Sequence, residues 1–261
     1  MAKKPIKVTE VVLRDAHQSL LATRMTVDDM RPILPEMDKI NYFSVECWGG
    51  ATFDVAYRFL HESPWERLRL LREKIPNIPF QMLLRGSNLV GYASYPDNLV
   101  RAFIAESARE GIDVFRVFDS LNWMPNMETA MDEVLRQGKF LEGTVCYTGD
   151  ILDPTRDRYT LKYYVDFAKE LERRGAHMLA IKDMSGLLKP YAAKKLVSTL
   201  SCDIFVVDLN KFFLRCHINP PHIIVFLKRQ QQIICRCPAL KVQKIYFAEV
   251  VAVSVAASVT A

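Results

Sequence analysis

The sequence predicts an α/β fold of the (β/α)8 TIM-barrel type that is incomplete after its sixth βα unit. Six short apolar runs recur roughly every 30 to 38 residues in the first 200 residues, with helical patterns between them. A polar or charged residue lies at or directly after the end of each run. The composition changes near residue 200, because all ten glycines precede that point and four of the six cysteines follow it. We therefore divide the chain into a body, residues 1–200, and a divergent tail, residues 201–261.

The predicted strands are short and rich in β-branched and aromatic residues, which favour an extended chain. Because they alternate with helical patterns, the strands are expected to be parallel and joined by right-handed crossovers. The strand predictions cover residues 8–13, 42–47, 80–84, 112–118, 140–147 and 177–181.

Helices are predicted from start and stop signals between these runs. Ser63 is suited to be an N-cap, Pro64 to the first helical turn, and Glu66 to a capping box. Three further helices each end at a glycine that suits a left-handed C-cap. They cover residues 96–110, 124–137 and 160–174, and the glycines are Gly111, Gly138 and Gly175.

The residues after the strands favour a barrel over a doubly wound sheet, although the order of elements fits both. A doubly wound sheet usually has a glycine-rich loop after its first strand, and residues 13–18 contain no glycine. A barrel would bring every carboxyl strand end to one rim, where barrel enzymes have their active sites. The polar groups after the runs are Arg14-Asp15, Glu46, Arg85, Asp119, Thr148 and Lys182-Asp183.

Charged residues at these strand ends indicate a site for a small anion or a metal. Asp15 and Asp119 could bind a cation or act as bases, and Lys182 is a flexible amine at a strand end. Arginine can hold a carboxylate by a forked pair of hydrogen bonds. Any one of these charges, taken alone, is more simply explained by solvation or pairing, but their convergence on one concavity favours a ligand. The candidate arginines are Arg14, Arg85 and Arg116.

Charge and hydropathy exclude two classes of function. The body carries 28 Lys and Arg against 27 Asp and Glu, so most of the net charge of +5 belongs to the tail and no nucleic acid partner is expected. The sequence has no run of about 18 uncharged apolar residues and begins without an apolar leader core, so we expect a cytoplasmic protein. The cysteines lack regular spacing and are expected to be reduced thiols.

Five segments of the body, taken together, are more specific than any single motif. They are LRDAHQS at 13–19, ECWGGATFD at 46–54, QMLLRG at 81–86 with GY at 91–92, FRVFD at 115–119 with LNW at 121–123, and IKDM at 181–184 with GLL at 186–188. In this order they closely resemble the carboxyltransferase domain of biotin-dependent enzymes. That family includes the oxaloacetate decarboxylase alpha subunit, the B subunit of pyruvate carboxylase and the transcarboxylase subunit that forms oxaloacetate. The resemblance covers about residues 6–200.

The resemblance implies a biotin-dependent carboxyltransferase that interconverts oxaloacetate and pyruvate through carboxybiotin at a divalent metal site. Asp15 matches the family's aspartate metal ligand. Lys182 matches a lysine that becomes carbamylated and then binds the metal, which would be Zn, Mn or Co. The catalytic residues implied are Lys182, Arg85 and Asp119.

The resemblance also implies residues for substrate and cofactor. Arg14, Gln18 and Arg85 match residues around pyruvate or oxaloacetate. Asp54 and Tyr92 match the pocket that receives carboxybiotin, and biotin would be carried on a separate domain or subunit. The implied partners are a biotin-carrier protein or domain together with membrane decarboxylase subunits or a biotin carboxylase subunit. A homo-oligomer is expected for the full-length enzyme.

The tail departs from the family and predicts an impaired enzyme. The family's next strand carries a His-x-His pair that completes the metal shell, whereas His217 and His222 are five residues apart in this chain. Residues 204–209 and 222–227 are apolar enough to supply substitute seventh and eighth strands, and residues 250–255 form a further apolar run. The abrupt loss of family motifs favours a shifted reading frame or a splice into unrelated sequence after about residue 200.

Two alternatives remain open. Metal-dependent barrel lyases and acyl-condensing enzymes share an early strand-end aspartate such as Asp15, but the segment 46–54 and the motif around Lys182 argue against them. A non-catalytic truncated homologue would keep the substrate rim and use the apolar runs of the tail for assembly.

Overall fold

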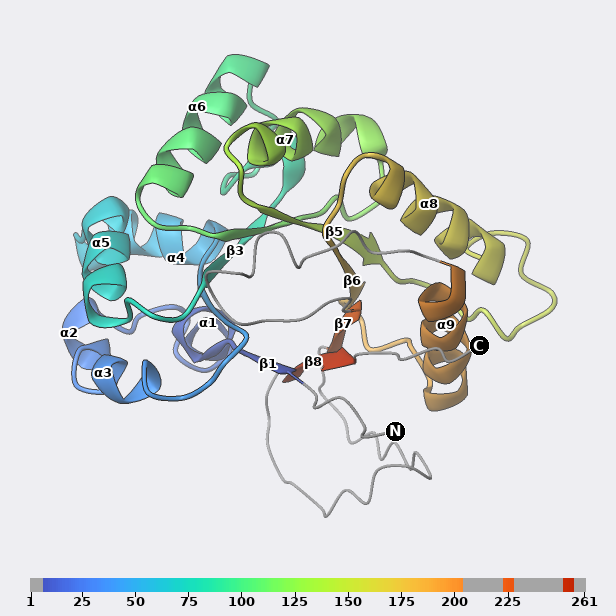
Figure 1. Cartoon of the computed structure of the whole chain (residues 1–261), viewed down its shortest axis with the longest axis horizontal. Helices are drawn as coiled ribbons and strands as arrows, with labels where there is room; N and C mark the ends of the chain where they lie inside the picture. Colours follow the sequence, from blue (N-terminus) through green and yellow to red (C-terminus); the bar gives the residue numbers. More distant parts are fainter. Residues whose placement is uncertain (1–6, 204–222, 228–250, 256–261) are drawn as a thin grey trace, which may run out of the picture.

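Eight strands close into a barrel in the computed structural model, which describes residues 7–203, 223–227 and 251–255. Neighbouring strands from β1 to β7 are parallel, and β8 is antiparallel to both β7 and β1. Figure 1 shows the helices on the outside of the strands. The strands are β1 (Lys7–Glu10), β2 (Ser44–Trp48), β3 (Phe80–Leu84), β4 (Val114–Val117), β5 (Phe140–Cys146), β6 (Met178–Asp183), β7 (Ile223–Leu227) and β8 (Val251–Val255).

Each of the first six strands is followed by helical structure, so the six predicted βα units are confirmed. The predicted N-cap Ser63 is present, since its hydroxyl accepts from the Glu66 N–H, and Thr160 caps α8 in the same way by accepting from the Tyr163 N–H. No helix in the described ranges is long and apolar enough to span a membrane. The helical segments are η1 (Val12–Ala16), α1 (His17–Leu20), α2 (Val27–Met30), α3 (Leu34–Met37), α4 (Gly50–Val55), η2 (Ala56–Leu60), α5 (Pro64–Lys74), η3 (Gly86–Asn88), α6 (Asp97–Arg109), α7 (Met124–Arg136), α8 (Leu161–Arg173) and α9 (Pro190–Asp203).

The first strand is shorter than predicted, and its early end shapes the rim. We expected a strand over residues 8–13, but β1 ends at Glu10 and a π-helical turn, η1, follows. The Glu10 carboxylate accepts hydrogen bonds from the N–H groups of Val11 and Val12, at 2.8 and 2.9 Å. These backbone donors are therefore unavailable to a sheet ladder, and the chain turns inward.

The two apolar runs of the tail that the structure describes are both strands. The run 222–227, which we predicted as an eighth strand, forms β7 and pairs in parallel with β6. The run 250–255 forms β8. The run 204–209, predicted as the seventh strand, lies outside the described residues. All eight strands of an ordinary (β/α)8 barrel are parallel, so the antiparallel β8 is where this ring departs from that fold.

The strands separate two buried layers of different character. The outer layer, called the apolar layer here, lies between strands and helices and includes Val45, Leu71 and Phe115. The inner layer, called the polar interior, is identified by side-chain contacts between strands that are not neighbours in the ring, which only the inside of a barrel permits. Glu46 on β2 contacts Arg116 on β4 in this way. The polar interior comprises Thr9, Ser44, Glu46, Gln81, Arg116, Glu142 and Thr144.

Candidate active site

A cluster of charged side chains lies where the first strand ends. Three N–H groups of the π-helical turn η1 share the Val11 carbonyl, which places Arg14 and Asp15 side by side in the buried interior. The Arg14 guanidinium pairs with Glu46 on β2 and donates to Asp15 Oδ1 at 2.9 Å. It also donates to Gln18 Oε1 at 3.4 Å, one helical turn later. The predicted residues Arg14, Asp15 and Gln18 therefore form one cluster.

Asp15 has one carboxylate oxygen with an open coordination position. Its Oδ1 accepts from Arg14, whereas its Oδ2 is buried and has no hydrogen-bond partner among the described residues. Buried carboxylate oxygens are normally paired, so such an atom suits a ligand. The predicted role of Asp15 as a metal ligand stays a prediction.

Lys182 lies on β6 in a mostly buried position. Burial lowers the pKa of Lys182 to about 8, and the nearby positive charge of Arg14 adds to this effect. Its Nζ lies 5.1 Å from the centre of the Phe118 ring, and the described residues give it no ion pair or hydrogen bond. A substantial fraction of neutral amine is therefore present near pH 8, which is the form that reacts as a nucleophile.

Arg85 and Tyr92 form a second group at the rim. Arg85 directly follows β3, and its Nη1 donates to the Gly91 carbonyl at 2.9 Å. The guanidinium centre lies 5.2 Å from the centre of the Tyr92 ring, and Tyr92 is 76 % exposed. The aromatic ring is thus accessible to a ligand and adjoins a fixed positive charge.

Two other predicted residues have local partners. Asp54 on α4 pairs with Arg58 at 2.8 Å. Asp119 follows β4, and its Oδ1 accepts from the N–H groups of Leu121 and Trp123 while its Oδ2 accepts from Asn126 at 2.9 Å. These bonds fix the loop after β4, and the catalytic role of Asp119 and the cofactor role of Asp54 stay predictions.

The polar interior adjoins the first cluster, and there the predicted candidate Arg116 pairs with protein carboxylates, one of which, Glu142, was not predicted as a site residue. Glu46 is shared between Arg14 and Arg116, and Arg116 also pairs with Glu142. Burial alone would raise the pKa of Glu46, but the two arginines outweigh it and the pKa lies below its usual value. Burial dominates at Glu142 and raises its pKa. The available signal was alternation, since polar residues occupy every second position on β2, at Ser44 and Glu46, and on β5, at Glu142 and Thr144.

The described residues do not by themselves fit a complete metal site. They contain no group of three or more His, Cys, Asp or Glu side chains that could hold an ion. Asp15 offers one free oxygen, and Lys182 offers an amine, which binds a metal only after it loses its proton or is modified. His217 and His222 lie outside the described residues. The predicted metal role of Asp15 and Lys182 stays a prediction.

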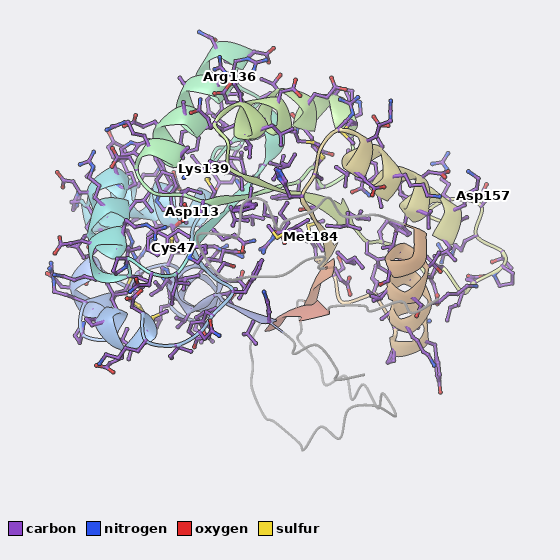
Figure 2. The ribbon with its side chains drawn as sticks, viewed as in Figure 1. Cys47, Asp113, Arg136, Lys139, Asp157 and Met184 are labelled. Carbon is purple, nitrogen blue, oxygen red and sulfur yellow. The ribbon has the colours of Figure 1, made fainter. Side chains whose placement is uncertain are left out.

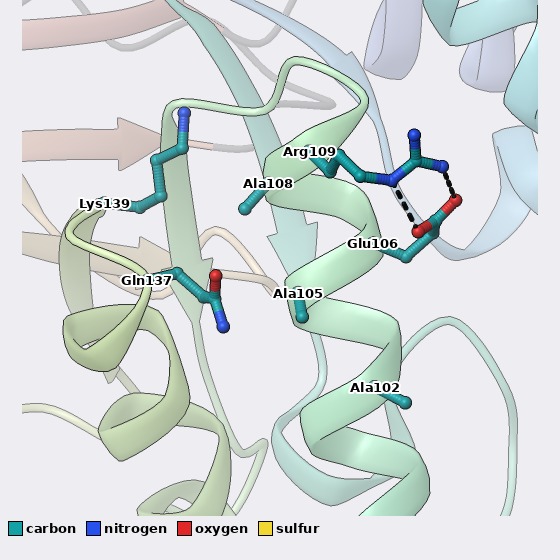
Figure 3. Close-up of a pocket in the computed structure, with 7 residues that line it drawn as sticks. All are labelled: Ala102, Ala105, Glu106, Ala108, Arg109, Gln137 and Lys139. Carbon is teal, nitrogen blue, oxygen red and sulfur yellow. Dashed lines mark hydrogen bonds and ion pairs between the residues drawn. The ribbon is translucent and has the colours of Figure 1, made fainter.

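A hollow of about 460 Å³ lies elsewhere, on the outer side of the barrel between α6 and the chain that enters β5 (Figure 3). It is near the amino ends of the strands, because Arg109 ends α6 and Lys139 precedes β5. Figure 2 shows the rim and the outer side of the barrel in one view. Met184, which directly follows β6 and marks the rim, lies toward the middle of the ring, whereas Arg136, at the end of α7, lies at the outer margin. The hollow is lined by Ala102, Ala105, Glu106, Ala108, Arg109, Gln137 and Lys139.

Comparison with known proteins identifies the body of the chain. Pyruvate carboxylase of Staphylococcus aureus is 60 % identical over 198 residues, which cover 75 % of this chain and 17 % of that protein. The B subunit of pyruvate carboxylase from Methanothermobacter thermautotrophicus is 53 % identical over 197 residues, or 76 % of this chain and 34 % of that protein. This chain thus spans about a sixth to a third of the length of these relatives. No family model matches the chain.

Solved structures agree with this assignment. The carboxyl transferase domain of Rhizobium etli pyruvate carboxylase with pyruvate has a TM-score of 0.75 and 53 % identity, over 77 % of this chain and 35 % of that one. The same domain with pyruvate and biocytin has a TM-score of 0.74 and 53 % identity, over 76 % of this chain and 34 % of that one. The predicted family is confirmed, and this chain is a homologue of the carboxyltransferase domain of pyruvate carboxylase, an enzyme.

Proposed function

We propose that the body of this chain binds pyruvate or oxaloacetate at the barrel rim and serves carboxyl transfer with carboxybiotin. The observation that carries the proposal is that Arg14 and Arg85 both lie against the Gly49–Gly50 segment after β2: a Cβ atom built on Gly49 would lie 3.7 Å from Arg14 Cδ, and one built on Gly50 would lie 2.9 Å from Arg85 Nη2. Guanidinium groups bind small carboxylates by forked hydrogen bonds. The relatives solved with pyruvate and with biocytin support this choice of ligands.

Each side chain has a distinct part in this proposal. Arg85 and Gln18 hold the substrate carboxylate, and Arg14 orients Gln18 and Asp15 through its hydrogen bonds. The positive charge of Arg85 stabilises the enolate that develops when the carboxyl group leaves oxaloacetate. Tyr92 offers an exposed ring and Asp54 a carboxylate toward the biotin ring system.

The proposal includes a divalent ion, Zn, Mn or Co, and this chain would supply two of its ligands, Asp15 and Lys182. Asp15 would contribute its free oxygen, and Lys182 would contribute once its neutral amine has added CO2 and released a proton. This addition converts a positive side chain into an anionic oxygen donor. When bound, such an ion polarises the keto oxygen of the substrate.

The partners and the tail complete the proposal. Biotin would arrive on a carrier domain or a separate subunit, with a biotin carboxylase subunit or membrane decarboxylase subunits as the source of carboxybiotin; the relative that is named as a B subunit supports a multi-subunit arrangement. Residues 1–200 would be the carboxyltransferase body and residues 201–261 a divergent tail. The body's activity would be impaired, because the tail lacks the His-x-His pair.

The substrate site is tested by substituting Arg85. Arg85→Ala should weaken pyruvate binding, measured by calorimetry, by about 1.5 to 3 kcal/mol, which is the range for a hydrogen bond to a charged group. Arg109→Ala is the matched control, because Arg109 is an exposed arginine near the opposite strand ends. Equal affinity in the parent chain and Arg85→Ala would remove Arg85 from the site and with it the proposal.

The state of Lys182 is tested with a chimera in which the residues after 200 are replaced by the corresponding segment of the Staphylococcus aureus relative. With ¹³C-bicarbonate and a divalent ion, NMR should show a carbamate signal in the chimera that Lys182→Arg abolishes. The present chain should keep the free amine and decarboxylate oxaloacetate more slowly than the chimera. A free amine in both proteins would contradict the assigned role of Lys182.

A further inference from the structure

We infer that Gly50 is a positioning residue for Arg85: the missing side chain at Gly50 leaves the space that seats the Arg85 guanidinium, and this seat sets the affinity for a substrate carboxylate. The inference rests on the proposed function, in which Arg85 holds that carboxylate. Gly50 is the first residue of α4 and lies two residues after the end of β2.

The Arg85 guanidinium occupies the space that a side chain at Gly50 would take. A Cβ atom built on Gly50 would lie 2.9 Å from Nη2, 3.0 Å from Cζ and 3.1 Å from Nη1 of Arg85. Favourable contacts between non-bonded heavy atoms lie near 3.5 to 4.0 Å. The three distances are almost equal, so the guanidinium lies flat against Gly50.

The guanidinium is also held by residues 91 and 92 of the loop after β3. Arg85 Nη1 donates to the Gly91 carbonyl at 2.9 Å, and the Tyr92 ring centre lies 5.2 Å from the guanidinium centre. A Cβ atom at Gly50 would therefore push the guanidinium against the loop that holds it, or out of this seat. In both cases the Arg85 N–H groups that would donate to the substrate carboxylate change position.

Backbone conformation does not require glycine at this position. The φ angle of Gly50 is not in the left-handed region that favours glycine, unlike that of Gly86, which has φ +49°. Alanine is also the better helix former at the start of α4. Because the crowded atoms belong to the far end of a flexible side chain, Gly50→Ala should move Arg85 and leave the fold intact.

The neighbouring Gly49 provides a matched control one residue away. Its backbone is extended, with φ 169° and ψ −167°, which other residues adopt. A Cβ atom on Gly49 would lie 3.4 Å from the Leu83 carbonyl oxygen and 3.7 Å from Arg14 Cδ, which are ordinary contacts. Gly49→Ala adds the same methyl group without displacing Arg85.

The experiment measures pyruvate binding by calorimetry and thermal unfolding for the whole chain and its variants. Gly50→Ala should bind pyruvate about tenfold more weakly, and Gly49→Ala should stay within about twofold. Both should melt within about 2 °C of the parent chain. In an Arg85→Ala background, Gly50→Ala should cause no further loss, because two residues that act through one group are not additive.

A second pair of variants tests whether the planar guanidinium is needed for the effect, and an NMR signal of Arg85 tests its displacement without any ligand. Lysine has no planar head to meet the added methyl group, so Arg85→Lys with Gly50→Ala should bind like Arg85→Lys alone. The Nε–Hε NMR signal of Arg85, assigned by its loss in Arg85→Ala, should shift in Gly50→Ala and not in Gly49→Ala. If Gly50→Ala unfolds, glycine is required by the fold and the inference is wrong.

The outcomes separate this inference from the proposed function. Unchanged pyruvate affinity in Arg85→Ala, or no binding by the parent chain, would reject the proposed function, and with it the affinity that the inference assigns to Gly50. If Arg85→Ala weakens binding and Gly50→Ala does not, the function stands and the inference is rejected. An equal loss from Gly50→Ala with and without the Arg85 side chain would also reject it.

Discussion

On the outer side of β2, Val45 and Cys47 pack into the apolar layer, whereas on the inner side Ser44 and Glu46 belong to a network of charges and amides. Barrel interiors are usually filled by branched apolar residues. Here the interior instead joins arginines and carboxylates from different strands. The comparison shows that alternate residues of one strand serve two purposes. The outward residues stabilise the barrel by apolar packing, and the inward Glu46 holds the charged side chains of Arg14 and Arg116 in place.

The largest effect is expected where the polar interior loses a shared charge. Glu46→Ala removes the carboxylate that pairs with both Arg14 and Arg116 and leaves two buried cations without that partner. We expect a loss of about 3 to 5 kcal/mol in the free energy of unfolding, measured with denaturant. Glu106→Ala removes an exposed carboxylate paired with Arg109 and should cost less than about 1 kcal/mol. Similar values for both would show that water reaches the interior.

A smaller effect is expected from a cavity in the apolar layer. Leu71 on α5 is fully buried, and Leu71→Ala should lower the free energy of unfolding by about 3 kcal/mol. The folded fraction should bind pyruvate with unchanged affinity, because Leu71 packs in the apolar layer on α5 and is not one of the residues of the candidate site. Leu99→Ala, at a leucine that is 44 % exposed, should cost about 1 kcal/mol or less. A change in pyruvate affinity for Leu71→Ala would show that the two layers are coupled.

The smallest effect concerns a histidine at the amino end of β6. His177 Nδ1 accepts from the Leu141 N–H at 3.0 Å, and burial lowers the pKa of His177 below its usual value. The unfolded chain therefore takes up a proton before the folded chain does, so stability falls as the pH falls below about 6.5.

Comparison with His177→Gln isolates this dependence. Glutamine keeps an acceptor oxygen and does not titrate, so the variant should lose less stability than the parent chain between pH 7.5 and 5.5. The free energy of unfolding of the two proteins should differ in its pH slope by less than about 1.4 kcal/mol per pH unit, which is the slope for the uptake of one proton on unfolding. Parallel curves for the two proteins would show that His177 takes up its proton equally in both states.

The sequence predicted the local parts of this structure well. Helices expected over 96–110 and 160–174 occur at Asp97–Arg109 and Leu161–Arg173, because caps and C-terminal glycines act within a few residues. The end of β1 was missed, because the Glu10 side chain competes with the sheet for backbone donors. The antiparallel direction of β8 was also missed, since an apolar run carries no information about strand direction.

Part of the candidate site was also predictable. The family resemblance named Arg14, Asp15 and Gln18 as site residues, and the structure brings their side chains into contact within one turn of the chain. The role of Glu46 was missed because its partner Arg116 is 70 positions away and faces it only across the closed ring. The seat of Arg85 on Gly50 joins two motifs of the sequence, and only folding brings them into contact.

The antiparallel last strand also decides which strand ends lie opposite the site. Leu227 at the end of β7 pairs on one side with Asp183 at the rim end of β6 and on the other with Val251 at the start of β8. From there β8 runs away from the rim, so that Ser254 pairs with Lys7, the first residue of β1. Lys7 and Val255 therefore lie at the end of the barrel opposite the site, which is some 15 Å from the rim at about 3.3 Å per residue. A probe attached to either residue should leave ligand access unobstructed.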